Sequence, residues 1–443
     1  MKKILLLSLP PLKNIIDDLK PKENDSICSN EDLEMLQNSI YTIIDEYIIN
    51  NVDQYKKEDF NDLIEEYVYN ILQMTYIDLY ELFYDIDIND IIQNTMLIYF
   101  QSKNNPRSYK NTFDTFENMN KIKSRIDYVS KIPQASQNTE EWYKYRYNRL
   151  TASDIYKALD TQSKKNELIF KKCKPLNLKK CSSVNTNSAM HWGHKYEPLS
   201  TMLYEDKYDT IIKEFGCITH DKYDFLGASP DGLNVKEGNT RYGRLLEIKN
   251  PTSRKINGIP KKEYWIQMQL QMEVWDFNYV DFLETSFKEY ENEEAFLNDG
   301  TFKKTNEGKL KGVILQFQDT TSNPHYEYMP VNLPEEKYDK WYEETFKKNE
   351  LNNFIWITNI YWKLDDISCI LVPRNKKWFN YALPYFKSIW DIIVKERKTG
   401  SSHRAPKKKL KSKSIVEQSP PVTFKFHTES FDQIIFDENE LEI

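Results

Sequence analysis

Three charged residues in two short motifs could support phosphodiester chemistry. Asp231 lies in the motif Ser-Pro-Asp-Gly, and Glu247 and Lys249 follow in the motif Leu-Glu-Ile-Lys, in which Glu247 is sixteen positions after Asp231. Residues i and i+2 of a strand point to the same face, so Glu247 and Lys249 would project together from an otherwise apolar strand. If these charges are buried, they need partners or a metal ion.

An aspartate at the end of one strand and a glutamate on the next could hold Mg²⁺ between them. Mg²⁺ prefers a few hard oxygen ligands, completed by water and substrate phosphate. Lys249 would add a positive charge beside the attacking water or the phosphate in the transition state. This set of groups suits the hydrolysis of a phosphodiester bond.

Each motif also has a simpler interpretation. Ser-Pro-Asp-Gly by itself is an ordinary turn sequence, because Pro and Gly supply the backbone angles of a turn. Glu-x-Lys by itself usually marks a surface ion pair. His191 and His194 have a spacing that invites a zinc site, but no third ligand is evident in the sequence.

Hydrophobic periodicity indicates the elements that must position these residues. The expected strands are Phe225–Ala228, Leu245–Ile248, Tyr279–Thr285 and Gly312–Phe317. The expected helices are Thr139–Asp160, Ala189–Tyr208, Tyr264–Trp275 and Lys376–Lys395, with a lysine-rich loop over Lys164–Lys180. The order β–β–α–β after helices predicts an α/β fold with a mixed central β-sheet flanked by helices.

The length and the charge distribution indicate several domains. A chain of 443 residues allows two or three domains. Residues 1–100 hold 20 acids and 7 bases, a net charge of −13, whereas the rest has a net charge of +6 and alone matches a polyanion binder. We therefore expect an acidic helical domain over 1–105, a catalytic core over 106–300, a C-terminal α/β extension packing on the core over 301–398, and a basic, disordered tail over 399–443.

Composition argues against several other classes of protein. The 11 glycines disfavour glycine-rich nucleotide loops and propeller repeats. The five cysteines have no CxxC spacing, which argues against a zinc ribbon or a clustered iron–sulfur site, and their scatter suggests a reducing compartment. No stretch reaches the ~18–20 apolar residues of a membrane span, and the apolar run before Pro10 is shorter than a signal core. We expect an intracellular protein with no membrane partner.

The order of Asp followed by Glu-x-Lys resembles the PD-(D/E)XK nuclease superfamily. The flanking segments are similar to the phage lambda exonuclease and YqaJ-like viral recombinase family, over about residues 139–290. The similar blocks are Trp142–Arg146 with Leu150–Ser153, Trp192–Pro198, Phe225–Gly232, Leu246–Lys249 and Tyr264–Gln269. The resemblance implies a restriction-endonuclease-like core, and the size, the charge split and the amino acids of AT-rich codons fit a large-DNA-virus member.

The resemblance also implies a role for each residue of the metal site. Asp231 and Glu247 would bind the metal ion, helped by the backbone carbonyl of Ile248, and Glu197 would lie beside it as a ligand or through water. Lys249 would be the catalytic lysine. Mg²⁺ would be the cofactor, with Mn²⁺ able to substitute. Glu197 precedes a proline, so it could instead mark only a helix boundary.

Three further residues would contact the substrate. Arg146 and Ser153 would hold a terminal 5′-phosphate, because Arg offers forked donors and Ser a hydroxyl. Gln269 would orient a phosphate or the nucleophile, with Gln267 and Gln271 so near that a one-step shift within this helix stays open. The alternatives are a helix-surface role for Arg146, an N-cap role for Ser153 and a polar helix face for the glutamines.

The expected function is a Mg²⁺-dependent DNA exonuclease that acts 5′→3′ on duplex ends and makes single strands for viral recombination or repair. An endonuclease of the same fold and a non-catalytic DNA-binding or scaffolding protein are the alternatives, as is a partner-binding role for the acidic helical domain. The expected partners are double-stranded DNA ends and a single-strand annealing protein, with an oligomer left open. The expected location is the host cytoplasm (a viral factory) or the virion, or the nucleus through the basic run from Arg404 to Lys413.

Overall fold

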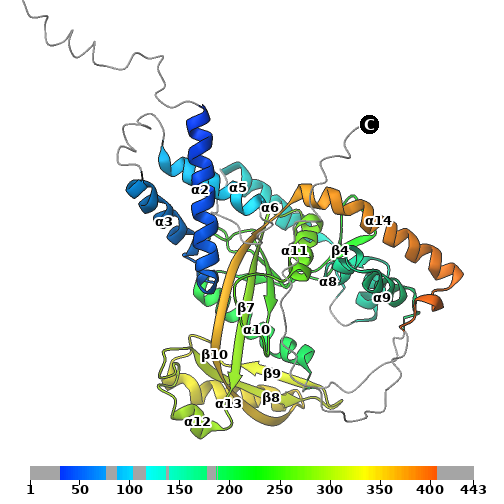
Figure 1. Cartoon of the computed structure of the whole chain (residues 1–443). Helices are drawn as coiled ribbons and strands as arrows, with labels where there is room; N and C mark the ends of the chain where they lie inside the picture. The colour runs from blue at the N-terminus through cyan, green and yellow to red at the C-terminus, as the bar shows by residue number, and fades with distance from the viewer. Residues whose placement is uncertain are drawn as a thin grey trace, which may run out of the picture. The chain divides into compact units, whose positions relative to one another are not determined.

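The larger of two sheets is mixed and has seven strands in the order β2-β5-β6-β7-β10-β8-β9; Figure 1 labels β7, β10, β8 and β9 of this sheet. The computed structural model describes residues 30–75, 87–102, 116–135, 139–176, 186 and 188–406. A second, three-stranded sheet has the order β1-β4-β3, and helices pack against both sheets. This arrangement confirms the predicted α/β fold class with a mixed central sheet.

Neighbouring strands of the large sheet carry the Asp231 and Glu247 motifs. β5 (Gly232–Asn234) and β6 (Leu245–Lys249) form an antiparallel hairpin, and β2 (Ile212–Lys213) pairs with the outer side of β5. Gly232 is required in β5 because a Cβ there would collide with Ile212. The chain then passes through helix α11 (Lys262–Trp275) into β7 (Tyr279–Glu289), which lies parallel to β6. A parallel neighbour needs such a crossover, so the observed order follows from strand geometry.

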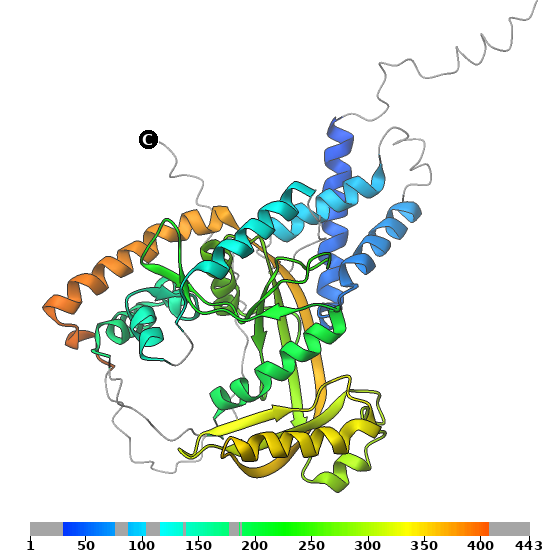
Figure 2. The same ribbon diagram turned by 180° about the vertical axis from the view of Figure 1, so that it is seen from behind.

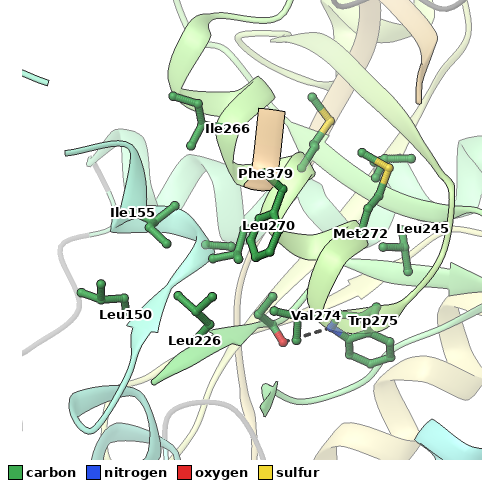
Figure 3. Close-up of a cluster of buried hydrophobic side chains, with 14 of the residues drawn as sticks. Leu150, Ile155, Leu226, Leu245, Ile266, Leu270, Met272, Val274, Trp275 and Phe379 are labelled. Carbon is green, nitrogen blue, oxygen red and sulfur yellow. Dashed lines mark hydrogen bonds between the residues drawn. The ribbon is translucent and has the colours of Figure 1, made fainter. Parts of the chain in front are cut away.

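Helix α11 is fixed in place by an apolar core. Leu270, Met272 and Trp275 are fully buried with residues of the small sheet, and the indole N–H of Trp275 donates to the carbonyl of Ala228 (3.1 Å; Figure 3). The strands of the small sheet are β1 (Leu150–Thr151), β3 (Ile218–Thr219) and β4 (Leu226–Ala228). Because one side of α11 is packed in this way, the directions of its polar side chains are fixed as well.

Two predictions about the helices before the sheet are wrong. The segment predicted as one helix over 139–160 is divided into α7 (Glu140–Tyr147), β1, α8 (Ala152–Ile155) and the 3₁₀ helix η3 (Tyr156–Leu159). The break arises because β1 pairs with β4 and takes Leu150 into the core. The stretch predicted as a lysine-rich loop begins as helix α9 (Gln162–Cys173), which buries two apolar residues, and its part from 177 lies outside the described residues.

The C-terminal extension shares the large sheet with the core. Strand β10 (Ile355–Pro373) is 19 residues long and pairs antiparallel with both β7 and β8. Helix α12 (Glu293–Leu297) ends just before the predicted extension begins. The other elements of the extension up to β10 are β8 (Lys311–Gln318), β9 (Pro324–Tyr328), η4 (Glu335–Lys337) and α13 (Tyr338–Leu351). They are followed by α14 (Lys376–Thr399) and η5 (Ser402–Arg404). One continuous sheet therefore crosses the predicted boundary at residue 300, and the domain limits stay predictions.

The first described helices have a hydrophobic core of their own. Helices α2 (Asn30–Asn50), α3 (Phe60–Thr75) and α5 (Ile88–Ser102), with η2 (Val52–Gln54), bury a separate apolar cluster. Ion pairs connect the η2–α3 turn to other parts of the chain: Lys56 to Asp366 (2.6 Å) and Glu58 to Lys207 (2.9 Å). The remaining helices are α6 (Phe116–Lys131) and α10 (Ala189–Tyr208), the latter with the predicted bounds. Within the described ranges, no helix is both long and apolar enough to cross a bilayer.

Candidate active site

The β5–β6 hairpin brings Asp231 to the strand of Glu247. The backbone N–H of Asp231 donates to the carbonyl of Leu246 (3.0 Å). One carboxylate oxygen of Asp231 accepts a hydrogen bond from the backbone N–H of Ile248 (2.7 Å). These two bonds hold Asp231 beside the backbone of β6, so the two motifs form one site.

Glu247 is fully buried, and both of its carboxylate oxygens are paired. Oε1 accepts hydrogen bonds from Nζ of Lys249 and from Nε2 of Gln267, the latter at 2.7 Å. Oε2 accepts from Nε2 of Gln271 at 2.6 Å. Gln267 and Gln271 are one turn apart on α11, so the helix holds the carboxylate that the strand presents. Three hydrogen bonds to this carboxylate offset the cost of burying its polar oxygens.

Glu197 on α10 belongs to the same electrostatic cluster. Burial and the negative charge of Glu247 raise the pKa of Glu197 to about 7. Burial, together with the charges of Glu247 and Glu197, raises the pKa of Asp231 well above its ordinary value. Burial by itself would lower the pKa of Lys249, but the charges of Glu247 and Asp231 outweigh it and raise that pKa. The carboxylates disfavour one another's charged forms, and a cation beside them would relieve this repulsion.

The donor chemistry of the cluster suits Mg²⁺, although its carboxylates are not preassembled around one metal position. In the described part of the chain, no three His, Cys, Asp or Glu side chains are arranged so that they could hold a metal ion. Both oxygens of Glu247 bond instead to lysine and glutamine side chains. Mg²⁺ is commonly held by only one or two carboxylates, with water and substrate phosphate as the other ligands. Asp231 and Glu247 are therefore an adequate protein donor set.

The zinc alternative for the histidine pair gains no support. The ring nitrogen Nε2 of His191 lies 2.6 Å from the hydroxyl of Tyr326, and the ring is buried. Burial, with the positive charge of Lys195 beside it, lowers the pKa of His191. His194 points to solvent on the same helix. His191 therefore serves as a packed, hydrogen-bonded side chain between α10 and β9.

Arg146 and Ser153 lie together, as the sequence predicts. Arg146 is in the last turn of α7, and its guanidinium donates to Oγ of Ser153 on α8 (3.0 Å). The same guanidinium lies 4.5 Å from the centre of a ring of Trp142. Helix α8 begins one residue before Ser153 with Thr151 at its N-cap position, so Ser153 is not that cap. A guanidinium beside a hydroxyl suits an anionic ligand, and the 5′-phosphate role stays a prediction.

Lys172 contacts the backbone of Arg146, and the sequence analysis did not identify this residue. Its Nζ donates to the carbonyls of Arg146 and Arg149, both at 2.6 Å. Arg397 of α14 donates to the carbonyl of Tyr147 (2.6 Å). These donors bind carbonyls at and just beyond the C-terminal end of α7, where a helix leaves its last carbonyls without i+4 partners. Burial lowers the pKa of Lys172 to about 7. The available signal was that Lys172 shares a helical face with apolar residues, which the prediction of a loop concealed.

Gln269 does not lie with the carboxylates. Its Oε1 accepts from the backbone N–H of Asn375 (2.7 Å), and its Nε2 donates to the carbonyl of Pro373 (2.8 Å). Two residues along a helix differ in direction by about 200°, so Gln267 and Gln271 reach Glu247 while Gln269 faces away. The placement predicted for Gln269 therefore needs correction, because this residue joins α11 to the start of α14. Gln267 and Gln271 lie at Glu247 instead, and a role of a glutamine toward a phosphate or the nucleophile stays a prediction.

A further buried carboxylate, Glu284, was not expected near Lys249. It lies opposite Lys249 in the β6–β7 register and forms an ion pair with Arg254. Its second oxygen is buried without a hydrogen-bond partner among the described residues. Lys249 and Arg254 also lie 5.0 and 6.0 Å from the ring centre of Tyr264. The strand pairing that brings Glu284 here is not visible in the sequence.

Comparison with known proteins finds relatives for part of the chain. Residues 141–278 match the family model described as the YqaJ-like viral recombinase domain. An uncharacterised protein, R354, of Acanthamoeba polyphaga mimivirus is 32% identical over 308 residues, which cover 61% of this chain and 55% of the mimivirus protein. The aligned part of the chain thus spans about half the length of this curated relative.

Two solved structures also show similarity. An alkaline exonuclease (LHK-Exo) from Laribacter hongkongensis is 18% identical with a TM-score of 0.34, covering 59% of this chain and 95% of that one. A phage-related exonuclease from Haemophilus somnus 129PT is 13% identical with a TM-score of 0.30, covering 58% of this chain and 96% of that one.

Proposed function

We propose that the protein is a metal-dependent DNA exonuclease, because residues 141–278 match the family model of the YqaJ-like viral recombinase domain. The observation that carries the proposal is the placement of Asp231, Glu247 and Lys249 on one hairpin, with Glu197 electrostatically linked to them. Carboxylates for a metal ion and an amine for the phosphate are the groups that phosphodiester hydrolysis requires. A scaffold would gain nothing from burying such a cluster.

Asp231 and Glu247 would hold the metal ion, helped by the carbonyl of Ile248, and Glu197 would contact it directly or through water. Mg²⁺ is the proposed cofactor, with Mn²⁺ as a substitute, because both accept carboxylate and water ligands. When bound, the ion supplies a Lewis acid for the phosphoryl oxygens. The glutamines on α11 hold the Glu247 carboxylate in one orientation.

Lys249 acts on the reacting phosphate. Its ammonium group stays protonated because Glu247 and Asp231 raise its pKa. Three-quarters of its side chain is withdrawn from solvent, with an exposed fraction of 24%. A fixed positive charge in such a position stabilises the negative charge that develops on the phosphate during hydrolysis.

Arg146 and Ser153 would bind the terminal 5′-phosphate, which gives the enzyme a preference for ends and a 5′→3′ direction. A terminal phosphate carries more negative charge than an internal diester, so a forked guanidinium can distinguish the two. The product would be single-stranded DNA for viral recombination or repair. The proposed partners are duplex ends and a single-strand annealing protein, within the infected host cell.

The test uses linear duplexes with a 5′-phosphate or a 5′-hydroxyl, and a closed circle, each incubated with Mg²⁺ or with EDTA. We expect Mg²⁺-dependent release of nucleotides, fastest from the 5′-phosphorylated duplex and slowest from the circle. Equal rates on all three substrates would identify an endonuclease. Binding without cleavage in Mg²⁺ or Mn²⁺ would identify a scaffold and remove the proposal.

A further inference from the structure

Helix α14 is anchored at both ends to the parts of the protein that carry the candidate site. At its start, the backbone N–H of Asn375 donates to Gln269 of α11, the helix whose neighbouring glutamines hold Glu247. Near its end, Arg397 donates to the carbonyl of Tyr147, next to Arg146. At about 1.5 Å per residue, its 24 residues span roughly 36 Å. Figure 2 shows the helix as a long ribbon in orange. The helix therefore extends from the active-site helix to the Arg146 site.

The inner side of α14 is fully occupied by packing. Phe379, Phe386, Ile389 and Ile393 are buried in the main core, and Trp378 packs edge-on against Trp265 of α11 with ring centres 5.0 Å apart. These contacts fix the rotation of the helix about its axis. The residues that face outward are consequently set by the sequence spacing and the core together.

The outer side of α14 is strongly basic. Five of its exposed residues are lysines, and one exposed residue is an aspartate, Asp391. The lysines are Lys376, Lys377, Lys387, Lys395 and Lys398. Helix α13 offers a contrast within the same chain, because its exposed side carries three lysines and four acidic residues. The exposed charges of α13 are nearly balanced, whereas the excess of positive charge on α14 suits an anionic partner.

Two tyrosines lie on the same outward stripe as two of the lysines, Lys377 and Lys395. Tyr381 is 63% exposed and Tyr385 is 46% exposed, and their ring centres are 5.7 Å apart. With Lys377 and Lys395 they follow the spacing i, i+4, i+8 and i+18, which keeps them within one narrow stripe of a helix. Exposed aromatic rings between lysines match the pattern by which proteins bind nucleic-acid strands, where rings stack on bases and lysines contact phosphates.

We propose that the outer face of α14 binds single-stranded DNA. The proposal rests on the proposed function and adds to it a binding surface for the strand that the nuclease reaction exposes. Single strands are favoured over duplex because stacking on Tyr381 and Tyr385 requires unpaired bases. A surface that binds only duplex DNA would need the lysines but not the tyrosines, since lysine side chains contact the phosphates of a duplex through their charge.

The experiment measures binding of fluorescent oligo(dT) with a 5′-hydroxyl to the full-length protein in EDTA, so that neither cleavage nor a terminal phosphate contributes. We expect the double variant Tyr381→Ala/Tyr385→Ala to bind roughly 10- to 100-fold more weakly, the usual loss when stacked rings are removed. The variant Tyr381→Phe/Tyr385→Phe should retain near wild-type affinity, because it keeps the rings. A duplex of equal length should lose less than about twofold on the alanine changes.

The lysines are tested separately through salt dependence. Lys377→Gln/Lys395→Gln should reduce the slope of log affinity against log salt by about 1.4, since each single-strand phosphate contact contributes about 0.7. The matched control is Lys340→Gln/Lys347→Gln on α13, two exposed lysines paired with glutamates, which should leave the slope unchanged. Alanine and glutamine are good helix formers, and thermal unfolding checks that α14 stays folded.

Unchanged oligo(dT) affinity of the tyrosine variant would overturn the proposal, as would equal losses for duplex and single strand or equal losses in the α13 control. These results leave the proposed nuclease function untouched, because Mg²⁺-dependent cleavage is measured on the same proteins. Conversely, a wild-type protein that binds oligo(dT) through α14 but never cleaves DNA would support the surface and remove the nuclease.

Discussion

The Glu247 site and the Arg146 site hold their charges in different ways. Glu247 has no exposed surface, and its oxygens are engaged by Lys249, Gln267 and Gln271. Arg146 is half-buried and is supported through its backbone, where Lys172 takes up the carbonyl at the end of α7. A buried, fully paired carboxylate is suited to fixing charge at a reaction centre. A supported surface guanidinium is suited to recognising a ligand that arrives from solvent.

The largest expected effect is the loss of cleavage rate in Lys249→Ala, at the buried site. Loss of a fixed charge at a reacting phosphate typically costs about 10²–10³ in rate, while one charge among many phosphate contacts changes DNA affinity little. Single-turnover cleavage and duplex binding in EDTA measure the two effects. Lys288→Ala is the control, an exposed lysine on β7 paired with Asp365. Wild-type cleavage by Lys249→Ala would refute the catalytic role.

Arg146→Ala tests the surface site and should alter recognition rather than chemistry. Charge-assisted hydrogen bonds contribute about 1.5–3 kcal/mol, so the preference for 5′-phosphorylated over 5′-hydroxyl duplex should fall by about 10- to 100-fold. Arg146→Lys should restore only part of it, because lysine lacks the forked donors. Matched initial rates on the two duplexes measure the preference. A variant that keeps the wild-type ratio of rates would place end recognition elsewhere.

Two glutamines of α11 allow a second comparison with smaller expected effects, because Gln271 contacts Glu247 and Gln269 does not. Gln271→Ala frees one oxygen of Glu247, and we expect about a tenfold slower reaction per folded molecule. Gln269→Ala leaves the N–H of Asn375 without its partner, which should cost about 1–3 kcal/mol of stability with cleavage close to wild type. Thermal unfolding and cleavage rates of both variants provide the check. A greater loss of rate in Gln269→Ala would restore the original sequence prediction.

Lys172→Met should have the smallest effect on the rate preference, and it should change how the stability of the protein depends on pH. The folded-state pKa of Lys172 is about 7, below the ordinary lysine value, so the charged form is disfavoured by folding. This cost is fully present below pH 7 and declines as the pH rises from about 7 toward the ordinary lysine range. The melting temperature of the wild type minus that of Lys172→Met should therefore increase from about pH 6 to about pH 9, a range that includes this pKa.

Lys172→Met should also weaken the 5′-phosphate preference by a few-fold, because the end of α7 loses a donor to two carbonyls. The same two duplexes used for Arg146 measure this ratio. If the difference in melting temperature between the two proteins is the same at every pH, Lys172 does not titrate in the folded protein near neutrality.

Local pattern was enough to predict the hairpin residues and much of the fold class. Glu247 and Lys249 share a face because strand periodicity is a property of consecutive residues. The apolar run around them predicted β6, and the helical spacing of α10 predicted its bounds. Periodicity failed where short elements alternate, as between α7 and η3, because a two-residue strand such as β1 has no periodicity to detect.

The sequence by itself determined which residues could do the chemistry: Asp231 and the Glu247–Lys249 pair are fixed by local motifs, and so is the basic and aromatic composition of α14. Only the tertiary structure decided which glutamine reaches Glu247, that Lys172 supports Arg146, and that α14 spans from one site to the other. These outcomes depend on how far each helix is rotated by the core it packs against. That rotation is set by contacts between residues distant in the chain, such as Gln269 with Asn375 and Lys172 with Arg146.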